Sequence, residues 1–240
     1  PKLVAVSNKV AFVNPNAPVY PRLAQGKVWN EITVTWTSGY GIDEAEPFVE
    51  WGPKGGAQVR SPAGTLTFDR NTMCDFQPAS LNTTKQLIED LNDIDIVFHI
   101  GDIVYAMGYI AQWDQFIAQI EPIASTKPYM IGSGNHECVW PGTGSFYQNM
   151  DSGGECGVLA EKKFYVPAEN RANFWYSTDY GMFQFCIAHT ELDWRGRSEQ
   201  YKFIENCLAS VDRQRQPWLI FLAQSTRLFF CGLLCGRRVI

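Results

Sequence analysis

The sequence predicts an α/β layered core that follows a module made mostly of β-strands. Three observations support this prediction. Residues 28–70 alternate β-branched and aromatic residues between Gly- and Pro-rich turns. From about residue 80 the spacing of apolar residues becomes helical. Apolar, strand-like runs then alternate with helical segments up to residue 223, the order expected of an α/β layered fold.

In the first module we expect strands over residues 32–37 and 48–51 and a turn over residues 52–56. Ile32-Thr33-Val34-Thr35-Trp36-Thr37 alternates in the strand pattern, and Gly52-Pro53-Lys54-Gly55-Gly56 is typical of a turn. These strands are too few for a complete sandwich, and the strand-rich region stops without a linker between Cys74 and Asp75. The module is therefore expected to be partial, with residues missing at that junction.

The α/β core is expected to begin with a helix capped by Ser80, whose apolar stripe is Leu81, Thr84, Leu87, Ile88 and Leu91. The next run, Ile94–Ile100, is nearly continuous in apolar character, as in a strand buried on both faces. The later predicted elements are a helix over 113–120 closed by Glu121-Pro122, a strand over 128–131, a hairpin of 174–178 and 182–188, a helix over 199–212 and a strand over 218–223.

Composition excludes several classes of function. The chain has 240 residues, of which 45% are apolar and 19% charged, as in a folded globular protein. Its net charge of -5 and the absence of a basic run before the C-terminus argue against nucleic acid as a partner. The apolar runs are too short to span a membrane, so no membrane partner is expected. The chain opens at Pro1 without a signal peptide, which we interpret as the start of a fragment.

The seven cysteines form no CxxC pair, which argues against a zinc knuckle or a thioredoxin-like site. Cys186 lies in a buried-looking strand and is expected to be an inert core thiol, whereas Cys207 has no assigned partner. Asn82-Thr83-Thr84 is an acceptor sequence for N-glycosylation. Together with the cysteines, this sequon indicates a secretory compartment.

Two polar motifs follow two of the predicted strands. Gly101-Asp102-Ile103-Val104-Tyr105 places a carboxylate and a phenol at the end of the first strand, and Gly134-Asn135-His136-Glu137 places an amide oxygen and an imidazole after the next. Each motif alone is more often an ordinary turn. The two motifs in succession, separated by a helix, favour a shared crevice at the ends of the strands. Oxygen donors with imidazole suit one transition metal ion or a pair of them.

These two motifs resemble those of the purple acid phosphatases, within the calcineurin-like metallophosphoesterases. The resemblance to the plant high-molecular-weight branch is continuous from residue 78 to residue 223, and residues 1–74 resemble the front of its fibronectin-like N-terminal domain. It implies a partial fibronectin-like β domain over 1–74 and a partial α/β layered metallophosphoesterase core over 75–223. Residues 224–240 have no acidic residue and are interpreted as an atypical C-terminal tail.

The resemblance also implies a binuclear metal centre. Asp102 would bridge the two metal ions, Tyr105 would bind Fe(III), and Asn135 would bind a divalent zinc, manganese or iron ion. His136 would be the catalytic residue that contacts the phosphate and assists the leaving group.

Four of the seven metal ligands of the family are missing from this chain. No Gly-Asp-x-Gly occurs before residue 101, the His of a later strand falls at Gln224, and Gly-His-x-His is absent. His99 and His189 do not fall at ligand positions of the family, and we interpret both as structural. The three remaining donors are expected to hold at most one metal ion.

The function implied by the resemblance is that of a metal-dependent acid phosphatase, a hydrolase of small phosphate monoesters. One alternative is a phosphodiesterase or nucleotide pyrophosphatase of the same superfamily. Another is a catalytically inactive fragment that arises from splicing or from gene prediction. The resemblance further implies a secreted or vacuolar glycoprotein, and it permits a homodimer.

Overall fold

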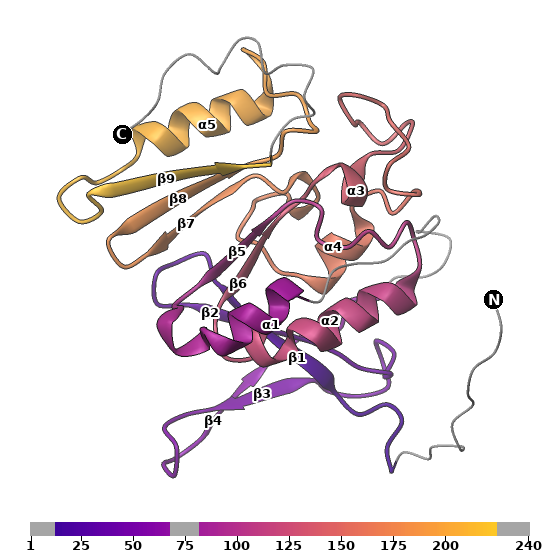
Figure 1. Ribbon diagram of the computed structural model, residues 1–240. Helices are drawn as coiled ribbons and strands as arrows, with labels where there is room; N and C mark the ends of the chain where they lie inside the picture. The colour runs from indigo at the N-terminus through magenta and orange to yellow at the C-terminus, as the bar shows by residue number, and fades with distance from the viewer. Residues whose placement is uncertain (1–12, 68–81, 225–240) are drawn as a thin grey trace.

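The computed structural model of the protein describes residues 13–67 and 82–224. The junction at 74/75, the expected cap Ser80 and the tail from residue 225 onward lie outside the described residues, as do Cys74, Cys231 and Cys235. The chain forms two antiparallel hairpins followed by an α/β part (Figure 1).

The first hairpin pairs β1 (Val19–Gln25) with β2 (Ile32–Thr37), and the second pairs β3 (Phe48–Trp51) with β4 (Val59–Pro62). The strands expected over 32–37 and 48–51 are confirmed. The sequence analysis missed β1, which contains Pro21. Because proline cannot donate to a strand ladder, it is tolerated at an irregularity, and the register of β1 indeed shifts between Val19 and Arg22.

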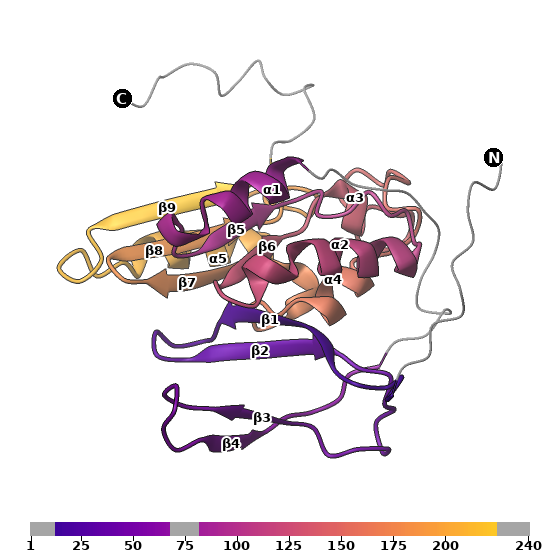
Figure 2. The same cartoon turned by 60° about the horizontal axis from the view of Figure 1, so that its bottom comes forward.

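The strand β1 connects the hairpins to the α/β part, and in Figure 2 it lies with β2 between the β3–β4 hairpin and the helices. Ala24 is buried in the main hydrophobic core. The backbone N–H of Gln25 donates to Met130 Sδ at 3.3 Å. The buried guanidinium of Arg22 donates from Nε to the backbone carbonyl of Lys163 at 2.9 Å. The first module is therefore joined to the core by buried contacts.

The described residues of the α/β part form two small sheets. One pairs β5 with β6 in parallel, and the other has the order β7-β8-β9, with β7 antiparallel and β9 parallel to β8. Its elements are α1 (Asn82–Glu89), the 3-10 turn Leu91–Asp93, β5 (Val97–Ile100), α2 (Ile110–Ala124), β6 (Tyr129–Gly132), α3 (Asn135–Cys138), α4 (Val158–Lys163), the 3-10 turn Arg171–Asn173, β7 (Tyr176–Tyr180), β8 (Phe183–Ala188), α5 (Glu199–Ala209) and β9 (Trp218–Ala223).

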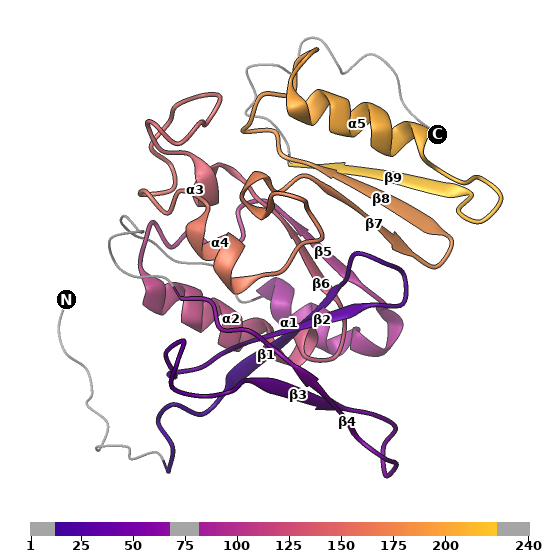
Figure 3. The ribbon, with the colours of Figure 1, turned by 180° about the vertical axis from the view of Figure 1, so that it is seen from behind.

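The two sheets pack against each other through aromatic side chains. The rings of Phe98 and Phe185 stack with their centroids 4.3 Å apart, and the hydroxyl of Tyr176 donates to the carbonyl of Ile131 at 2.8 Å. Figure 1 and Figure 3 show α5 beside β8 and β9, and α1 and α2 near β5 and β6. Trp113 of α2 is fully buried in the core. Each sheet thus has one face on the other sheet and a helix on its outer side.

Several element boundaries differ from those expected. The helix α2 extends through Pro122 to Ala124, whereas the sequence analysis ended it before Pro122. Proline removes one helical hydrogen bond, but Ile123 and Ala124 are fully buried, and the N–H of Ser125 donates to Glu121 O. The first core strand is shorter than expected and starts at Val97, because a 3-10 turn precedes it. The helix α5 ends at residue 209 rather than 212, and α3 occupies part of an expected loop.

The expectation that Cys186 is an inert thiol is wrong. Cys186 of β8 and Cys207 of α5 form a disulfide, with their Cα atoms 6.2 Å apart. The helix α5 is capped by Ser198, whose hydroxyl accepts the N–H of Tyr201 at 3.0 Å. The disulfide then fixes the other end of this helix to the sheet. Within the described residues, no helix has the length and apolar character needed to cross a bilayer.

Candidate metal centre

The two polar motifs meet at one edge of the parallel pair β5–β6. Ile100 and Gly132 are paired in register, and the N–H of Gly101 donates to Gly132 O at 2.9 Å. Asp102 and Asn135 follow these strand ends directly. Gly101 and Asp102 have φ angles of 77° and 49°, a left-handed turn that redirects the chain at the end of the strand. The predicted convergence of the two motifs is therefore present in the fold.

Tyr105 lies against both Asp102 and His136. Its hydroxyl donates to Asp102 Oδ2 at 2.9 Å, and its ring centroid is 4.2 Å from that of His136. Burial raises the pKa of Tyr105 to about 12, with a further contribution from the hydrogen bond to Asp102. The backbone N–H of His136 donates to Asp102 Oδ1 at 3.4 Å. His136 Nδ1 is buried and has no hydrogen-bond partner among the described residues.

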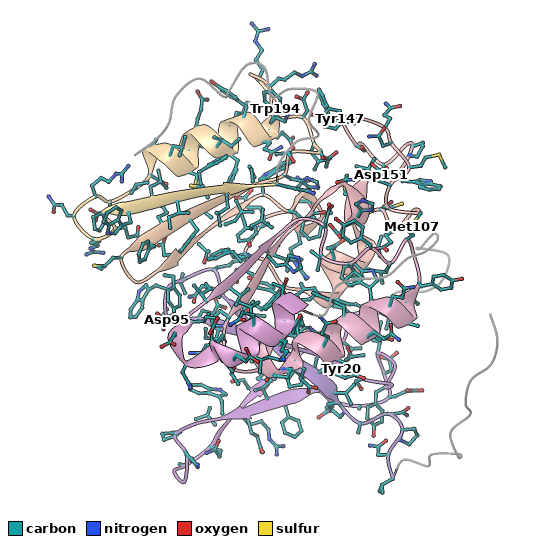
Figure 4. All side chains as sticks on the ribbon, viewed as in Figure 1. Tyr20, Asp95, Met107, Tyr147, Asp151 and Trp194 are labelled. Carbon is teal, nitrogen blue, oxygen red and sulfur yellow. A yellow bond between two sulfur atoms is a disulfide. The ribbon has the colours of Figure 1, made fainter. Side chains whose placement is uncertain are left out.

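Asn135 is held by side chains from two distant segments. Its Nδ2 donates to Asp151 Oδ2 at 3.1 Å, and its Oδ1 accepts from Gln224 Nε2 at 3.4 Å. Figure 4 labels Asp151 on the loop next to α3. The sequence analysis did not single out Asp151, because the loop that carries it has no recognisable motif. In the sequence analysis Gln224 is the first residue of the expected tail and the position at which the resembled family has a histidine.

Gly134 allows the two strand ends to approach each other. A Cβ atom at this position would lie 2.3 Å from Gln224 Oε1 and 2.5 Å from Asp102 Oδ1. At Gly101 a Cβ atom would lie 2.5 Å from Gln224 Cδ. Any larger residue at either glycine would displace the carboxamide of Gln224. The side chains of Asp102 and Gln224 thus lie against the backbone of both strand ends.

Glu137 links the loop after β5 to the loop after β6. It is fully buried, and its carboxyl oxygens accept the N–H groups of Val104 at 3.1 Å and Gly134 at 2.9 Å. Burial raises the pKa of Glu137 to about 8, with a smaller contribution from Asp102. The sequence analysis included Glu137 in its motif without a role. Its position shows that it fixes the loop after β5 to the loop after β6.

The two other histidines lie in different surroundings. His99 Nδ1 is 2.9 Å from the hydroxyl of Tyr129, and burial lowers the pKa of His99. His189 is fully buried, its backbone N–H and C=O bond to the side chain of Gln200, and burial lowers its pKa to about 3. These contacts favour the interpretation of both histidines as structural.

The strand ends carry oxygen donors that could contribute to a metal site. Within the part of the chain that the structure describes, no group of three or more His, Cys, Asp or Glu side chains is arranged to hold a metal. Asp102, Tyr105 and Asn135 bring oxygen donors to one place, including a single carboxylate. Oxygen donors suit hard cations, but one carboxylate is too little charge to hold two of them close together. The described donors at this edge are thus one carboxylate, one phenol and one amide oxygen.

Comparisons with known proteins identify relatives in plants. "Probable inactive purple acid phosphatase 1" of Arabidopsis thaliana is 56% identical over 305 residues, covering 93% of this chain and 50% of the relative. "Nucleotide pyrophosphatase/phosphodiesterase" of Hordeum vulgare is 64% identical over 153 residues, covering 64% of this chain and 42% of the relative. The chain spans about half the length of the curated relatives it matches.

A solved structure has the same fold. The structure of purple acid phosphatase PPD1 from yellow lupin (Lupinus luteus) seeds superposes with a TM-score of 0.87 and 59% identity, covering 93% of this chain and 54% of that one. The profile of the calcineurin-like phosphoesterases matches residues 73–237. The α/β layers, the strand-end site and these similarities together show that the chain belongs to the calcineurin-like phosphoesterase family, with plant purple acid phosphatases as its relatives.

Proposed function

We propose that this protein is an acid phosphatase that acts on small phosphate monoesters with one metal ion at the carboxyl ends of β5 and β6. The observation that carries the proposal is the convergence of Asp102, Tyr105, Asn135 and His136 at one sheet edge. Ligands of open α/β sheets bind at such edges, because loops from neighbouring strands meet there. The similarity to the lupin phosphatase supports the same chemistry.

In this proposal each side chain has a distinct role. Asp102 and Asn135 bind the metal through their oxygens, and Tyr105 holds one carboxylate oxygen of Asp102 through its hydroxyl. If the metal is iron, the phenol of Tyr105 is the donor suited to Fe(III), while zinc or manganese would rely on the other oxygens. A bound metal would supply Lewis-acid polarisation of a phosphoryl oxygen. His136 would donate a proton toward the leaving oxygen from its ring.

The activity of this chain is expected to be weak. Two-metal phosphatases clamp both the attacking and the leaving oxygen, and one metal ion can serve only one of them. The Arabidopsis alignment runs over 305 positions, more than the whole chain contains, so that relative has residues without a counterpart here. This difference supports the loss of internal residues, including the Asp ligand expected before residue 101.

Hydrolysis of phosphodiesters or nucleotide pyrophosphates is a second candidate, favoured by the similarity to the barley protein of that name. The donor set alone does not select the ester class. Initial rates of the metal-loaded chain on a monoester, a diester and a nucleotide sugar separate the two candidates. A rate on the nucleotide sugar at least tenfold above that on the monoester would replace the first proposal by the second.

We further propose that the protein resides in a secretory or vacuolar compartment as a glycoprotein. The Cys186–Cys207 disulfide supports an oxidising compartment, and the sequon begins at Asn82, the first residue of α1. Mass spectrometry of the natural protein would show glycan on Asn82. A homodimer remains a prediction of the resemblance, which light scattering on the purified chain tests directly.

The proposed function is tested by metal content together with phosphatase activity. The full chain is equilibrated with iron and zinc, desalted, and assayed for bound metal and for hydrolysis of p-nitrophenyl phosphate at acidic pH. We expect close to one metal per chain and activity that is lost in an Asp102→Asn, Asn135→Leu double variant. The matched control is Asp193→Asn, on an exposed turn. Equal activity in the wild-type chain and the double variant would refute the proposal.

A further inference from the structure

Two thiols lie on chain segments that contact each other beside the candidate site. Of the four cysteines that the structure describes, Cys186 and Cys207 form the disulfide, whereas Cys138 and Cys156 are thiols. Cys138 is the last residue of α3, the short helix that begins with Asn135. Cys156 lies two residues before α4. Figure 1 shows α3 and α4 next to each other, so the two thiols belong to neighbouring parts of the fold.

A backbone hydrogen bond holds these two cysteines close together. The N–H of Gly157 donates to the carbonyl of Glu137 at 2.7 Å. Cys138 directly follows the acceptor residue, and Cys156 directly precedes the donor residue. Because bond lengths and angles are nearly fixed, this hydrogen bond keeps the two Cα atoms within about 8 Å of each other. The Cα atoms of a disulfide are usually about 4.4–6.8 Å apart, so forming the bond requires a shift of at most roughly 1–3 Å in the loop.

Further contacts connect the same two segments. The backbone N–H and the hydroxyl of Ser152 both donate to the carbonyl of Val139, at 3.1 and 2.9 Å. Burial raises the pKa of Cys138 to about 12, and the neighbouring Glu137 and Cys156 add to the increase. The two thiol groups are thus close enough to influence each other electrostatically.

We propose that Cys138 and Cys156 form a second disulfide when the chain meets a small disulfide oxidant such as oxidised glutathione. The disulfide between Cys186 and Cys207 supports this inference, because a compartment that oxidises one pair of cysteines also oxidises others within reach. The inference goes beyond the proposed function and does not depend on it, since neither a metal ion nor a phosphate ester takes part.

The reaction is thiol–disulfide exchange in two steps. The partly exposed Cys156 attacks oxidised glutathione as its thiolate, the S–S bond of the oxidant breaks, and one glutathione leaves while the other stays bound to Cys156. Cys138 then attacks the Cys156 sulfur as its thiolate and releases the second glutathione. The protons of the two cysteines go to the two departing glutathione thiolates, so one disulfide is formed and one is reduced. The second step should be slow, because the buried Cys138 is almost entirely protonated.

The bond would close a loop that includes part of the support of the candidate site. Asp151, which accepts a hydrogen bond from Asn135 Nδ2 at 3.1 Å, lies between the two cysteines in the sequence. A closed loop has fewer unfolded conformations than an open one, so the oxidised chain should be more stable than the reduced chain. Oxidation should therefore raise the midpoint of urea unfolding in the wild type but not in a Cys138→Ser variant.

The test is a disulfide map of the full chain. The folded chain is incubated with oxidised glutathione, the remaining thiols are alkylated, and the protein is unfolded and digested with chymotrypsin. Residues 139–155 contain no Lys or Arg, so trypsin would leave both cysteines on one peptide, whereas chymotrypsin separates them by cleaving after Phe146. Mass spectrometry without reduction should then find the peptide of Cys138 linked to that of Cys156.

Two variants distinguish the proposed bond from other reactions of the thiols. In Cys138→Ser the second step cannot occur, so Cys156 should retain one bound glutathione per chain. In Cys74→Ser, the matched control, the link between Cys138 and Cys156 should form as it does in the wild type. The map of the wild-type chain decides the question if a variant does not fold.

The outcomes separate this inference from the proposed function. Alkylation of both Cys138 and Cys156 after oxidation, with the link between Cys186 and Cys207 present, would overturn the inference. A link from Cys156 to a cysteine other than Cys138 would also overturn it. Phosphatase activity does not enter the map, so an inactive chain can still show the bond and an active chain can still lack it.

Discussion

Glu155 allows a direct test of how burial changes the pKa of a carboxyl group, because its carboxyl group is fully buried and each of its two oxygens accepts a hydrogen bond. Oε1 accepts the N–H of Gly108 at 2.8 Å, and Oε2 accepts Nε1–H of Trp113 at 2.8 Å. Burial raises the pKa of Glu155 from 4.5 to about 8, and the nearby Glu137 adds to this increase. The folded protein therefore keeps a proton on Glu155 at pH values where the unfolded chain has lost it.

This difference makes stability depend on pH in a defined direction. The contribution of a carboxyl group with a raised pKa is fully present below pH 4.5, and it decreases as the pH rises toward 8. At about 1.4 kcal/mol for each pKa unit, the wild-type chain loses up to about 5 kcal/mol of unfolding free energy across this interval. A Glu155→Gln variant does not titrate and has no such loss.

The variant carries a fixed cost instead. A carboxamide has one acceptor oxygen, so either Gly108 N–H or Trp113 Nε1–H faces an amide NH₂, which costs about 1–3 kcal/mol. We therefore expect Glu155→Gln to be less stable than the wild type at pH 5 and equally or more stable at pH 8. Urea unfolding followed by tryptophan fluorescence at several pH values measures the difference. Glu137 is present in both proteins, so its own titration largely cancels. A stability difference that stays constant from pH 5 to pH 8 would refute the reasoning.

Three further predictions concern single side chains. Cys207→Ser, which removes the disulfide to Cys186, should lower the unfolding free energy by about 2–4 kcal/mol, and reductant should lower the urea midpoint of the wild type more than that of the variant. Asp114→Asn removes the carboxylate that lies 2.7 Å from the buried ammonium of Lys163. Because Asp114 is partly exposed, the unfolding free energy should fall by only about 1–2 kcal/mol. An unchanged midpoint of urea unfolding would contradict this prediction. Gln224→His places an imidazole at the candidate site, and this variant should bind Zn²⁺ about tenfold more tightly than the wild type does. Isothermal titration calorimetry measures the two affinities. Equal affinities would exclude residue 224 from the metal site.

The candidate site could be located from the sequence because it depends on a local pattern, in which polar residues directly follow apolar runs. The apolar runs ending at Ile100 and Ile131 predicted neighbouring strands whose following polar residues share a crevice, and the structure pairs these strands in parallel. The strand β1 was missed because Pro21 argues against a strand unless an irregularity accommodates it. Local pattern is thus a good guide to regular strands and a poor one to strands that contain a bulge.

The remaining parts of the site depend on contacts between distant segments. Asp151 reaches Asn135 from a loop without periodicity, and Glu137 acquires its role only through burial beneath both loops. The pairing of Cys186 with Cys207 was likewise not deducible, since seven cysteines allow many connectivities. Chemistry at strand ends could be predicted from residue order, whereas side-chain support from elsewhere in the chain required the fold.

The contacts of β1 bear on how the phosphoesterase part can be produced alone. A shortened chain that begins after the 74/75 junction would lose Arg22, whose guanidinium donates a hydrogen bond to the carbonyl of Lys163. It would also lose Ala24, which is part of the hydrophobic core. The truncated product would expose apolar surface next to α2 and β6 and leave a backbone acceptor without its donor. A boundary that is obvious in the sequence would therefore make a poor place to divide the protein, and any shortened version should retain the β1–β2 hairpin.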